Sequence, residues 1–237
     1  MNSGMYAALS GNLAALRRLE VVSNNLANAN TAGFKADQIQ FESVLANVKN
    51  PTQDPVFSNE RFSTDFSPGP MQKSDNPLDL ALEGDGFFVV NTPQGTAYTR
   101  QGNFHRGPGG RLVNADGYEV QGSNGPITVS GGRVQIGGDG VVTVDGVAAG
   151  TLARVDFPKP YALSKAGAGL FVPANTQAPA TPSTAEVKQG YLEGSNVKVI
   201  VEMARMIEAS RYFETCAKAV KGYDEMTARA ANDLGKV

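Results

Sequence analysis

The sequence is poor in the side chains on which most enzymes and metal sites depend. It contains one histidine, one cysteine and no tryptophan in 237 residues. A single cysteine excludes an internal disulfide, and one histidine with one cysteine cannot build a zinc site from several such ligands. The composition therefore excludes such zinc sites and internal disulfides, and with them much enzyme chemistry.

An excess of charge of one sign and long hydrophobic runs are also lacking. Lys and Arg number 21 against 23 Asp and Glu, whereas nucleic-acid binders need a clustered excess of basic residues. Apolar residues nowhere run for the ~18 positions that a membrane helix needs. Residues 1–9 lack the basic start of a secretory signal. We expect no nucleic-acid partner, no membrane insertion and no cleaved signal peptide.

Helix-breaking residues are nearly absent from both ends of the chain. All 13 prolines lie between Pro51 and Pro182, and most of the 27 glycines lie between Gly69 and Gly194. This pattern predicts an α+β fold in which long, coiled-coil-like N- and C-terminal helices flank a central antiparallel β-rich domain. The expected parts are an axial helix at 1–35, an extended arm or linker at 36–70, the β-rich domain at 71–185, and a strand with a second axial helix at 186–237.

The N-terminal segment carries one apolar stripe at helical spacing. Its members recur at steps of three or four residues, which places them on one face of a helix. We expect this helix to run from about residue 3 to about residue 28 and the chain to turn away by Gly33. The stripe comprises Met5, Leu9, Leu13, Leu16, Leu19, Val22 and Leu26. Residues 34–49 are compatible with a second helix or with an extended arm.

The C-terminal segment carries a longer heptad seam. It predicts a helix of about 38 residues, roughly 57 Å long, with an N-cap at Ser195 or Asn196. The seam comprises Val199, Met203, Met206, Ser210, Phe213, Ala217, Val220, Asp224, Thr227, Ala231 and Leu234. Two helices of unequal length cannot cover each other completely, so we expect the remaining apolar surface to pack against other chains.

Between the helices, short β-prone runs alternate with turns of Gly, Asn, Asp and Pro. Their spacing of about 8–12 residues is typical of an antiparallel sandwich or open barrel. Residues 114–117 and 145–146 resemble hairpin turns. The expected strands lie at 78–82, 87–91, 96–100, 111–113, 118–121, 127–129, 133–136, 141–144 and 152–157, and 173–184 is expected to be a linker.

Candidate catalytic groups are few. Cys216 lies on the helical seam and His105 in a glycine-rich turn, which does not favour a dyad, since a nucleophile needs an exposed thiolate and an oriented base. Residues 84–89 begin like a dinucleotide-binding loop but continue as a strand. Residues 137–140 resemble one calcium-binding turn without a second copy. We interpret residues 137–140 as a tight turn and predict no catalytic, cofactor-binding or metal-binding residue.

Three blocks of sequence resemble one protein family. The first contains SNNLAN at 23–28 and NTAGFK at 30–35; the second contains GDGFFVV at 84–90, YTRQGNF at 98–104 and GRLVNADGY at 110–118; the third contains QGYLEGSNV at 189–197 and EMARMI at 202–207. In this order, and over nearly the whole chain, they resemble the flagellar rod and hook axial proteins. The motif residues are Asn24, Asn25, Leu26, Asn28, Thr31, Gly33, Phe34, Gly84, Gly86, Phe87, Phe88, Gly194 and Asn196.

The resemblance implies a structural subunit of the bacterial flagellar basal-body rod that self-assembles through its terminal helices into a tubular drive shaft. It is strongest for the proximal rod members, with distal rod and hook-type members as alternatives. Implied partners are copies of the chain, other rod and hook axial proteins, and the flagellar type III export machinery, which would deliver it to a periplasm-spanning rod without a cleaved signal peptide. The helix-packing residues are then Leu9, Leu13, Leu16, Leu19, Val22, Leu26, Met203, Met206, Phe213, Val220 and Leu234.

Two other classes of function remain open from the sequence. One is a secreted β-rich binding module in which the helices are only a stalk. The other is an enzyme with a carboxylate site drawn from Asp75, Asp79 or Asp85, although the sequence pairs none of them with a base or a metal ligand.

Overall fold

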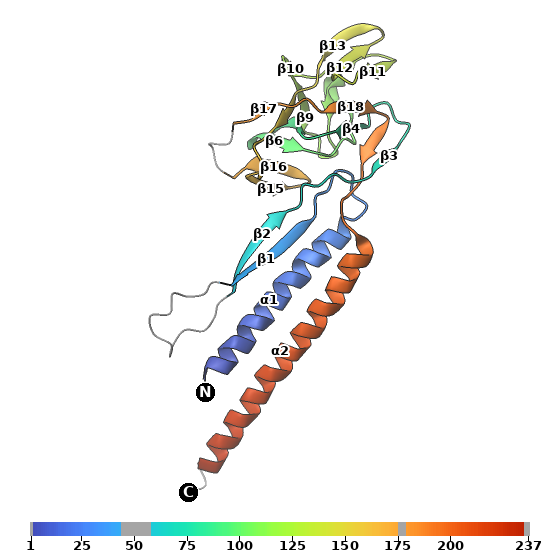
Figure 1. Cartoon of the computed structure of the whole chain (residues 1–237). Helices are drawn as coiled ribbons and strands as arrows, with labels where there is room; N and C mark the ends of the chain where they lie inside the picture. The colour runs from blue at the N-terminus through green and yellow to red at the C-terminus, as the bar shows by residue number, and fades with distance from the viewer. Residues whose placement is uncertain (1, 44–57, 175–178, 235–237) are drawn as a thin grey trace. The chain divides into compact units, whose positions relative to one another are not determined.

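The computed structural model describes residues 2–43, 58–174 and 179–234 (Figure 1). The chain divides into two compact units. The helical unit combines Met1–Ala27, Ala36–Asp65 and Val197–Val237, and the β unit combines Asn28–Lys35 with Phe66–Asn196. Neither helix, over its described length, has a stretch both long and apolar enough to cross a membrane. The α+β prediction, with terminal helices flanking a central β-rich region, is confirmed.

Helix α1 spans Asn2–Ala27, close to the predicted bounds. It contains no proline, and its large side chains recur at helical spacing. Beyond its end the Thr31 amide donates to the Asn28 carbonyl at 3.1 Å, and Gly33 adopts a φ of 66°. A left-handed residue of this kind favours glycine and carries the chain away from the helix direction.

Helix α2 spans Val199–Leu234 and has 36 residues. The N-cap predicted at Ser195 or Asn196 is wrong, because the first helical bond runs from the Glu202 amide to the Lys198 carbonyl. The Asn196 side chain donates instead to the carbonyl and the hydroxyl of Ser67, both at 3.2 Å. Those bonds hold Asn196 in the β unit, and the helix begins two residues later than an Asn196 cap requires.

Residues 37–64 contain a hairpin in the helical unit. Strand β1, Asp37–Ser43, pairs antiparallel with β2, Ser58–Thr64, in a register that matches Asp37 with Thr64 and Ser43 with Ser58. The alternation of Ile39 and Phe41 with polar neighbours explains the strand. Of the two alternatives for 34–49, the extended one is observed at 37–43, and 44–49 lie outside the described residues. Figure 1 shows the hairpin beside α1.

The β unit is built around a ten-stranded antiparallel sheet. Its path runs β15-β16-β6-β5-β9-β8-β7, with β10, β14 and β17 attached beside it. The strands are β5 Phe87–Thr92, β6 Gly95–Thr99, β7 His105–Arg106, β8 Leu112–Val113, β9 Glu119–Gly122, β10 Gly125–Pro126, β14 Arg154–Asp156, β15 Leu163–Gly167, β16 Leu170–Pro173 and β17 Thr181–Pro182. A short 3-10 helix, η1 Pro108–Gly110, lies between β7 and β8. Within the predicted linker 173–184, β17 is a short strand.

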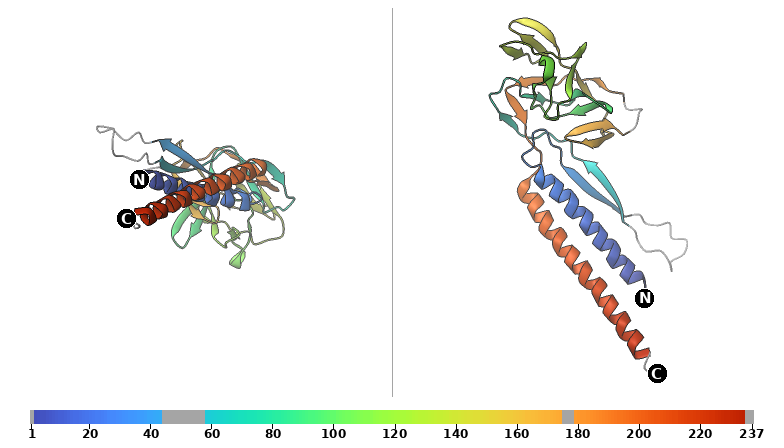
Figure 2. Two further views of the ribbon diagram at one scale, coloured as in Figure 1. Left: turned by 90° about the horizontal axis from the view of Figure 1, so that it is seen from below. Right: turned by 180° about the vertical axis from the view of Figure 1, so that it is seen from behind.

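Three smaller sheets complete the β unit, seen from two further sides in Figure 2. Strands β11 Val134–Ile136, β12 Val141–Val144 and β13 Val147–Thr151 form one of them. Strand β18 Glu186–Gln189 pairs with β4 Leu80–Glu83, and β19 Tyr191–Glu193 pairs with β3 Met71–Lys73. The last strands before α2 therefore pair with the first strands of the β unit.

One strand prediction is wrong, and another is confirmed over a shorter range. The segment 127–129 is not a strand: Thr128 makes a single bridge with Arg111, and the Ile127 amide donates to the Val120 carbonyl at 3.1 Å. The predicted strand 152–157 is confirmed over a shorter range as β14, while β13, which follows the turn at Asp145 and Gly146, was not predicted.

The central sheet buries both of its faces at β5. Phe88 and Val90 belong to the main core, whereas Phe87 points to the opposite face, as alternation along a strand requires. There Phe87 packs in an aromatic cluster with Phe157, Leu163 and Phe171, against which Phe66, Tyr98, Val155 and Tyr161 pack. Phe66 meets Phe87 edge to face at 5.9 Å between ring centroids. The segment that returns from the hairpin is thereby packed onto the sheet.

Candidate functional site

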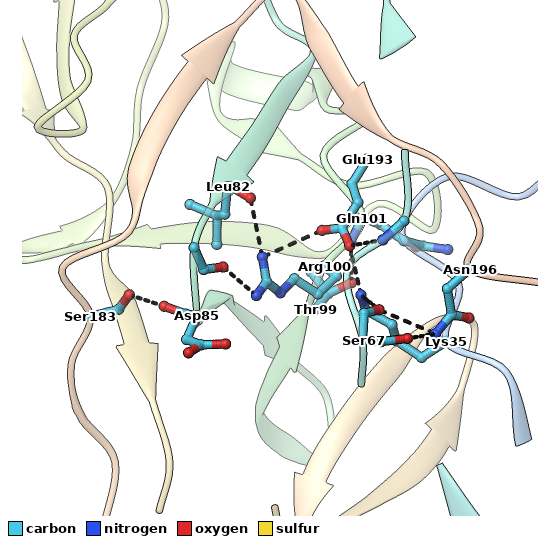
Figure 3. Close-up of polar contacts among 12 residues, drawn as sticks. Lys35, Ser67, Leu82, Asp85, Thr99, Arg100, Gln101, Ser183, Glu193 and Asn196 are labelled. Atoms are coloured by element: carbon cyan, nitrogen blue, oxygen red, sulfur yellow. Dashed lines mark hydrogen bonds and ion pairs between the residues drawn. The ribbon is translucent and has the colours of Figure 1, made fainter. Parts of the chain in front are cut away.

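A buried ion cluster lies inside the β unit where its terminal segments meet (Figure 3). It consists of Lys35, Arg100 and Glu193, whose side chains are 1%, 5% and 2% exposed. Unpaired ions of this kind are among the most costly groups to bury, so the arrangement depends on nearly every charge and lone pair having a partner.

Glu193, at the end of β19, is the anion shared by the cluster. Its Oε1 accepts from Lys35 Nζ at 2.6 Å and from the Gly69 amide at 3.0 Å. Its Oε2 accepts from Arg100 Nη1 at 3.4 Å, and its carbonyl accepts from the Gly33 amide at 2.6 Å. One residue thus joins four segments that are far apart in sequence.

Arg100, which directly follows β6, supplies the second cation. Nη2 donates to the Gly84 carbonyl at 2.6 Å, and Nη1 donates to the Leu82 carbonyl at 3.3 Å. The guanidinium lies over the Phe87 ring, 5.5 Å from its centroid. Its Nε has no partner among the described residues. Lys35 and Arg100 carry two positive charges, and Glu193 neutralises only one of them. Carbonyl dipoles and an aromatic face therefore stabilise the remaining positive charge.

Lys35 holds the N-terminal segment of the β unit in place. Its Nζ donates to the Ser67 carbonyl at 2.7 Å as well as to Glu193. Its carbonyl accepts from Lys165 Nζ at 2.6 Å, and that ammonium lies 4.3 Å from the centroid of the Phe34 ring. These contacts fix Phe34 and Lys35 between two other segments of the β unit.

Glycine is required where the backbones approach each other at the cluster. A Cβ on Gly33 would lie 2.5 Å from the Arg100 carbonyl carbon, and its φ of 66° disfavours other residues as well. The Gly194 amide donates to the Pro70 carbonyl at 2.8 Å. At Gly86, φ is 143° and a Cβ would collide with the Ser183 hydroxyl.

The cluster brings together motif residues from all three sequence blocks. Residues in or directly beside it are Gly33, Phe34, Gly84, Phe87, Gly194 and Asn196. Gly86 lies next to Phe87, and Phe88 packs in the main core against Phe104, 5.2 Å between centroids. Thr31 Oγ1 donates to Asn28 Oδ1 at 3.2 Å in the preceding turn. Asn24, Asn25 and Leu26 lie in the helical unit.

The arrangement holds segments together and offers no evident catalytic group. The acids considered from the sequence are each engaged: Asp75 pairs with Lys73 at 2.8 Å, and Asp79 accepts from Asn76 at 3.1 Å. The ammonium of Lys159, 2.6 Å away, lowers the pKa of the Asp85 carboxyl. In the described part of the chain no three His, Cys, Asp or Glu side chains gather as metal ligands. His105 belongs to the β unit and Cys216 to the helical unit.

In the helical unit, α1 and α2 lie side by side and antiparallel (Figures 1 and 2). Small residues of α1 make the contact: a Cβ on Gly4 would collide with the Tyr223 ring, and one on Gly11 would lie 3.0 Å from Cys216 Sγ and from Tyr212 Oη. Cys216 also raises the pKa of the Tyr212 phenol. Buried on the same seam are Ala15, Val22 and Ala209. Glycine and alanine let the two backbones approach closely.

A polar network closes the other end of this seam. Asn25, 1% exposed, donates from Nδ2 to the Asp37 carbonyl at 2.8 Å and to Glu202 Oε2 at 3.3 Å, and its Oδ1 accepts from the Asp37 amide at 2.8 Å. Glu202, also buried, accepts from Arg205 at 2.7 Å. One amide thus joins α1, β1 and α2, and a buried polar side chain on a helical seam fixes the register.

We expect Asn25→Asp to destabilise the helical unit by about 3 kcal/mol, because a carboxylate cannot donate to Asp37 and repels Glu202. Thermal unfolding followed by circular dichroism at 222 nm measures the loss. Ser23→Asp adds the same charge two residues away at an exposed position and serves as the control. Equal losses in both variants would show that the added charge, and not the network, is responsible.

The residues expected to pack between helices fall into three groups. Val22 is buried, and Leu19, Leu26, Met206, Phe213 and Val220 are half-buried. Exposed are Leu9, Leu13, Leu16 and Met203. The side chain of Leu234 lies outside the described residues.

Sequence reasoning missed the glycine and alanine contacts of the seam, because an apolar pattern is recognised by its large side chains. It also missed Lys35, Arg100 and Glu193, which occur as isolated charges. Their presence inside the three sequence blocks was the only available signal.

Comparisons with known proteins match the same three regions. Residues 5–35 match the family described as "Flagella basal body rod protein", residues 81–144 match "Flagellar hook protein FlgE/F/G D1 domain", and residues 188–234 match "Flagellar basal body rod FlgEFG protein C-terminal". Each of the three regions contributes one residue to the ion cluster: Lys35, Arg100 and Glu193, in that order.

Whole proteins are similar over their full length. The chain is 33% identical to the flagellar basal-body rod protein FlgF of Caulobacter vibrioides, covering 100% of both sequences. It is 33% identical to FlgF of Escherichia coli over 97% of both, and 31% identical to FlgG of Bacillus subtilis over 98% of this chain and 99% of the relative. Matches of this identity and coverage show that the chain belongs to the flagellar basal-body rod protein family.

Proposed function

We propose that the chain is a structural subunit of the flagellar basal-body rod that assembles through its terminal helices into a tube and transmits torque, and that it is not an enzyme. The observation that carries this proposal is the apolar surface left open on the helix pair. Leu9, Leu13 and Leu16 are between 42% and 53% exposed, and residues 1–16 contain no charged side chain.

An exposed apolar surface of this kind favours association with other chains over the monomeric state. Soluble monomers rarely expose contiguous apolar patches of this kind, and covering them with another chain removes apolar area from water at about 25 cal/mol per Å². The seam between α1 and α2 is already filled by Gly11, Ala15 and their partners, so the leucines require a partner outside the chain.

The β unit is built to resist deformation under torque. Its cores are close-packed on both faces of β5, and the buried ion cluster ties its first and last segments together. Close-packed interiors compress little, so torque applied to such a body is passed on rather than absorbed by deformation. In this proposal 1–35 and 186–237 are the axial parts, 36–70 is an arm, and 71–185 is the outer wall.

The proposed partners follow from family membership. They are copies of this chain, other axial proteins of the rod and hook, and the flagellar type III export machinery. The subunit belongs in the basal body, in the part of the rod that crosses the periplasm. The proposal includes no nucleic acid and no membrane insertion.

Leu16→Asp is expected to abolish motility, because an unpaired carboxylate would be buried at the contact between subunits. Swimming in soft agar and electron microscopy of isolated basal bodies measure the effect. Ser10→Asp, on an exposed polar position of the same helix, is the matched control and should swim normally. Normal swimming of Leu16→Asp would contradict assembly through this surface, provided that circular dichroism shows both variants equally helical.

A further inference from the structure

The helix pair carries two apolar ridges on its outer faces. The α1 ridge comprises Met5, Leu9, Leu13 and Leu16, which are 42–53% exposed. The α2 ridge comprises Ile200, Met203 and Ile207, which are 83%, 52% and 57% exposed. At about 100° per residue, each ridge lies roughly half a turn around its helix from the seam residues such as Gly11 and Ala209. Each therefore faces away from the partner helix in the same chain.

The ridges lie at opposite ends of the pair. Gly4 stands level with Tyr223, Gly11 with Cys216, and Asn25 with Glu202, so the two helices keep one constant antiparallel register. Each ridge occupies the N-terminal part of its own helix. In this register the centres of the two ridges are about 13 residues apart, which is roughly 20 Å along the axis.

Charged residues occupy the outer faces beyond the ridges. The same register places Leu9 level with Lys218, Leu13 level with Glu214 and Leu16 level with Arg211, all three of which are exposed. Likewise Ile207 stands level with Glu20, which is also exposed. If the outer face of α1 met the outer face of α2 on a second copy without an axial shift, four of the seven ridge residues would lie against a charge. These four are Leu9, Leu13, Leu16 and Ile207.

We propose that the α1 ridge of one copy packs against the α2 ridge of a second copy, displaced along the helix axis by about 20 Å. This inference rests on the proposed function and adds which surfaces meet and with what stagger. The displacement places Ile200 between Leu13 and Leu16, Met203 between Leu9 and Leu13, and Ile207 between Met5 and Leu9. Apolar side chains then interdigitate along the contact, and the charged faces lie outside it.

The stagger has a geometric consequence for the assembly. The two ridges are different surfaces, so the contact is head-to-tail and can be repeated by every copy. A lateral contact without displacement closes into a flat ring, whereas one with a constant axial displacement generates an inclined row of subunits and hence a helical tube. The offset between the ridges therefore sets the pitch of the row.

Disulfide crosslinking in swimming cells tests the stagger. In a Cys216→Ala background, the pair Leu13→Cys with Ile200→Cys places two thiols at the proposed contact, and Leu13→Cys with Glu214→Cys places them at the contact without displacement. Mild oxidation followed by a non-reducing gel should give a ladder of crosslinked subunits for the first pair and only monomer for the second. A ladder from the second pair, or from neither pair in cells that swim, would overturn the stagger.

Charge exchange provides an independent readout if cysteine variants do not assemble. Leu13→Glu should abolish swimming, and adding Ile200→Lys should restore at least part of it, whereas adding Glu214→Lys should not. Restoration by Glu214→Lys alone would overturn the proposal. Crosslinking and charge exchange test only the stagger. The proposed function has its own test: if cells that lack this chain still made basal bodies with a complete rod, the proposed function would be overturned.

Discussion

Glu193→Ala is expected to lower the free energy of unfolding of the β unit by about 3–5 kcal/mol, because it leaves Lys35 and Arg100 buried without their shared anion. The Gly69 amide loses its acceptor as well. Glu193→Gln keeps an acceptor for Lys35 but not the negative charge, and an intermediate loss is expected. Urea unfolding, followed by tyrosine fluorescence, measures both values.

Glu83→Ala is the matched control for this prediction. Glu83 is 63% exposed and pairs at the surface with Lys188 at 3.1 Å. Exposed pairs contribute about 0–1 kcal/mol, so its loss should be small. If Glu193→Ala cost no more than Glu83→Ala, the ion cluster would not be what holds the terminal segments of the β unit together.

Gly11→Leu is expected to separate α1 from α2 and to abolish motility. Even a Cβ at this position lies 3.0 Å from Cys216 Sγ and Tyr212 Oη, so a leucine side chain has no room on the seam. The melting temperature of the helices, followed by circular dichroism at 222 nm, should fall sharply. The unfolding transition of the β unit should hardly change, because Gly11 belongs to the helical unit.

Gly222→Leu provides the comparison for the helix seam. Gly222 also lies inside a helix, and a Cβ there meets nothing within 4 Å. This variant should be as stable as the parent or slightly more stable, since leucine favours helix over glycine by nearly 1 kcal/mol. Similar behaviour of the two variants would mean that helix propensity, and not the close approach at Gly11, determines the outcome.

The helices and half of the ten strands of the main sheet could be predicted from the sequence because each depends on local signals. The stripe from Met5 to Leu26 fixes α1 within a residue or two, and the turn at residues 145–146 marks the end of β12. The N-cap at Asn196 failed because a side chain with two partners in the β unit is not free to cap a helix. Local patterns do not reveal such competition.

The ion cluster could not be predicted for a different reason. Lys35 and Glu193 are separated by 158 residues, and neither charge differs from a surface residue in its own neighbourhood of sequence. The same holds for the pairing of β3 with β19 and of β4 with β18, which joins short segments across the whole β unit. Only the resemblance to a known family indicated that these blocks act together.

The β unit is closed by contacts between its first and its last segments. Strands β3 and β4 find their partners only in residues 186–193, and the Lys35 ammonium finds its anion only at Glu193. A chain that emerges N-terminus first therefore lacks the segments that close the β unit until nearly all of it has passed. Because long loops must close before these contacts form, the arriving end acts as the trigger for folding. If the chain is exported as proposed, this order of contacts would keep the β unit unfolded during passage and let it become rigid only after residues 186–193 have emerged.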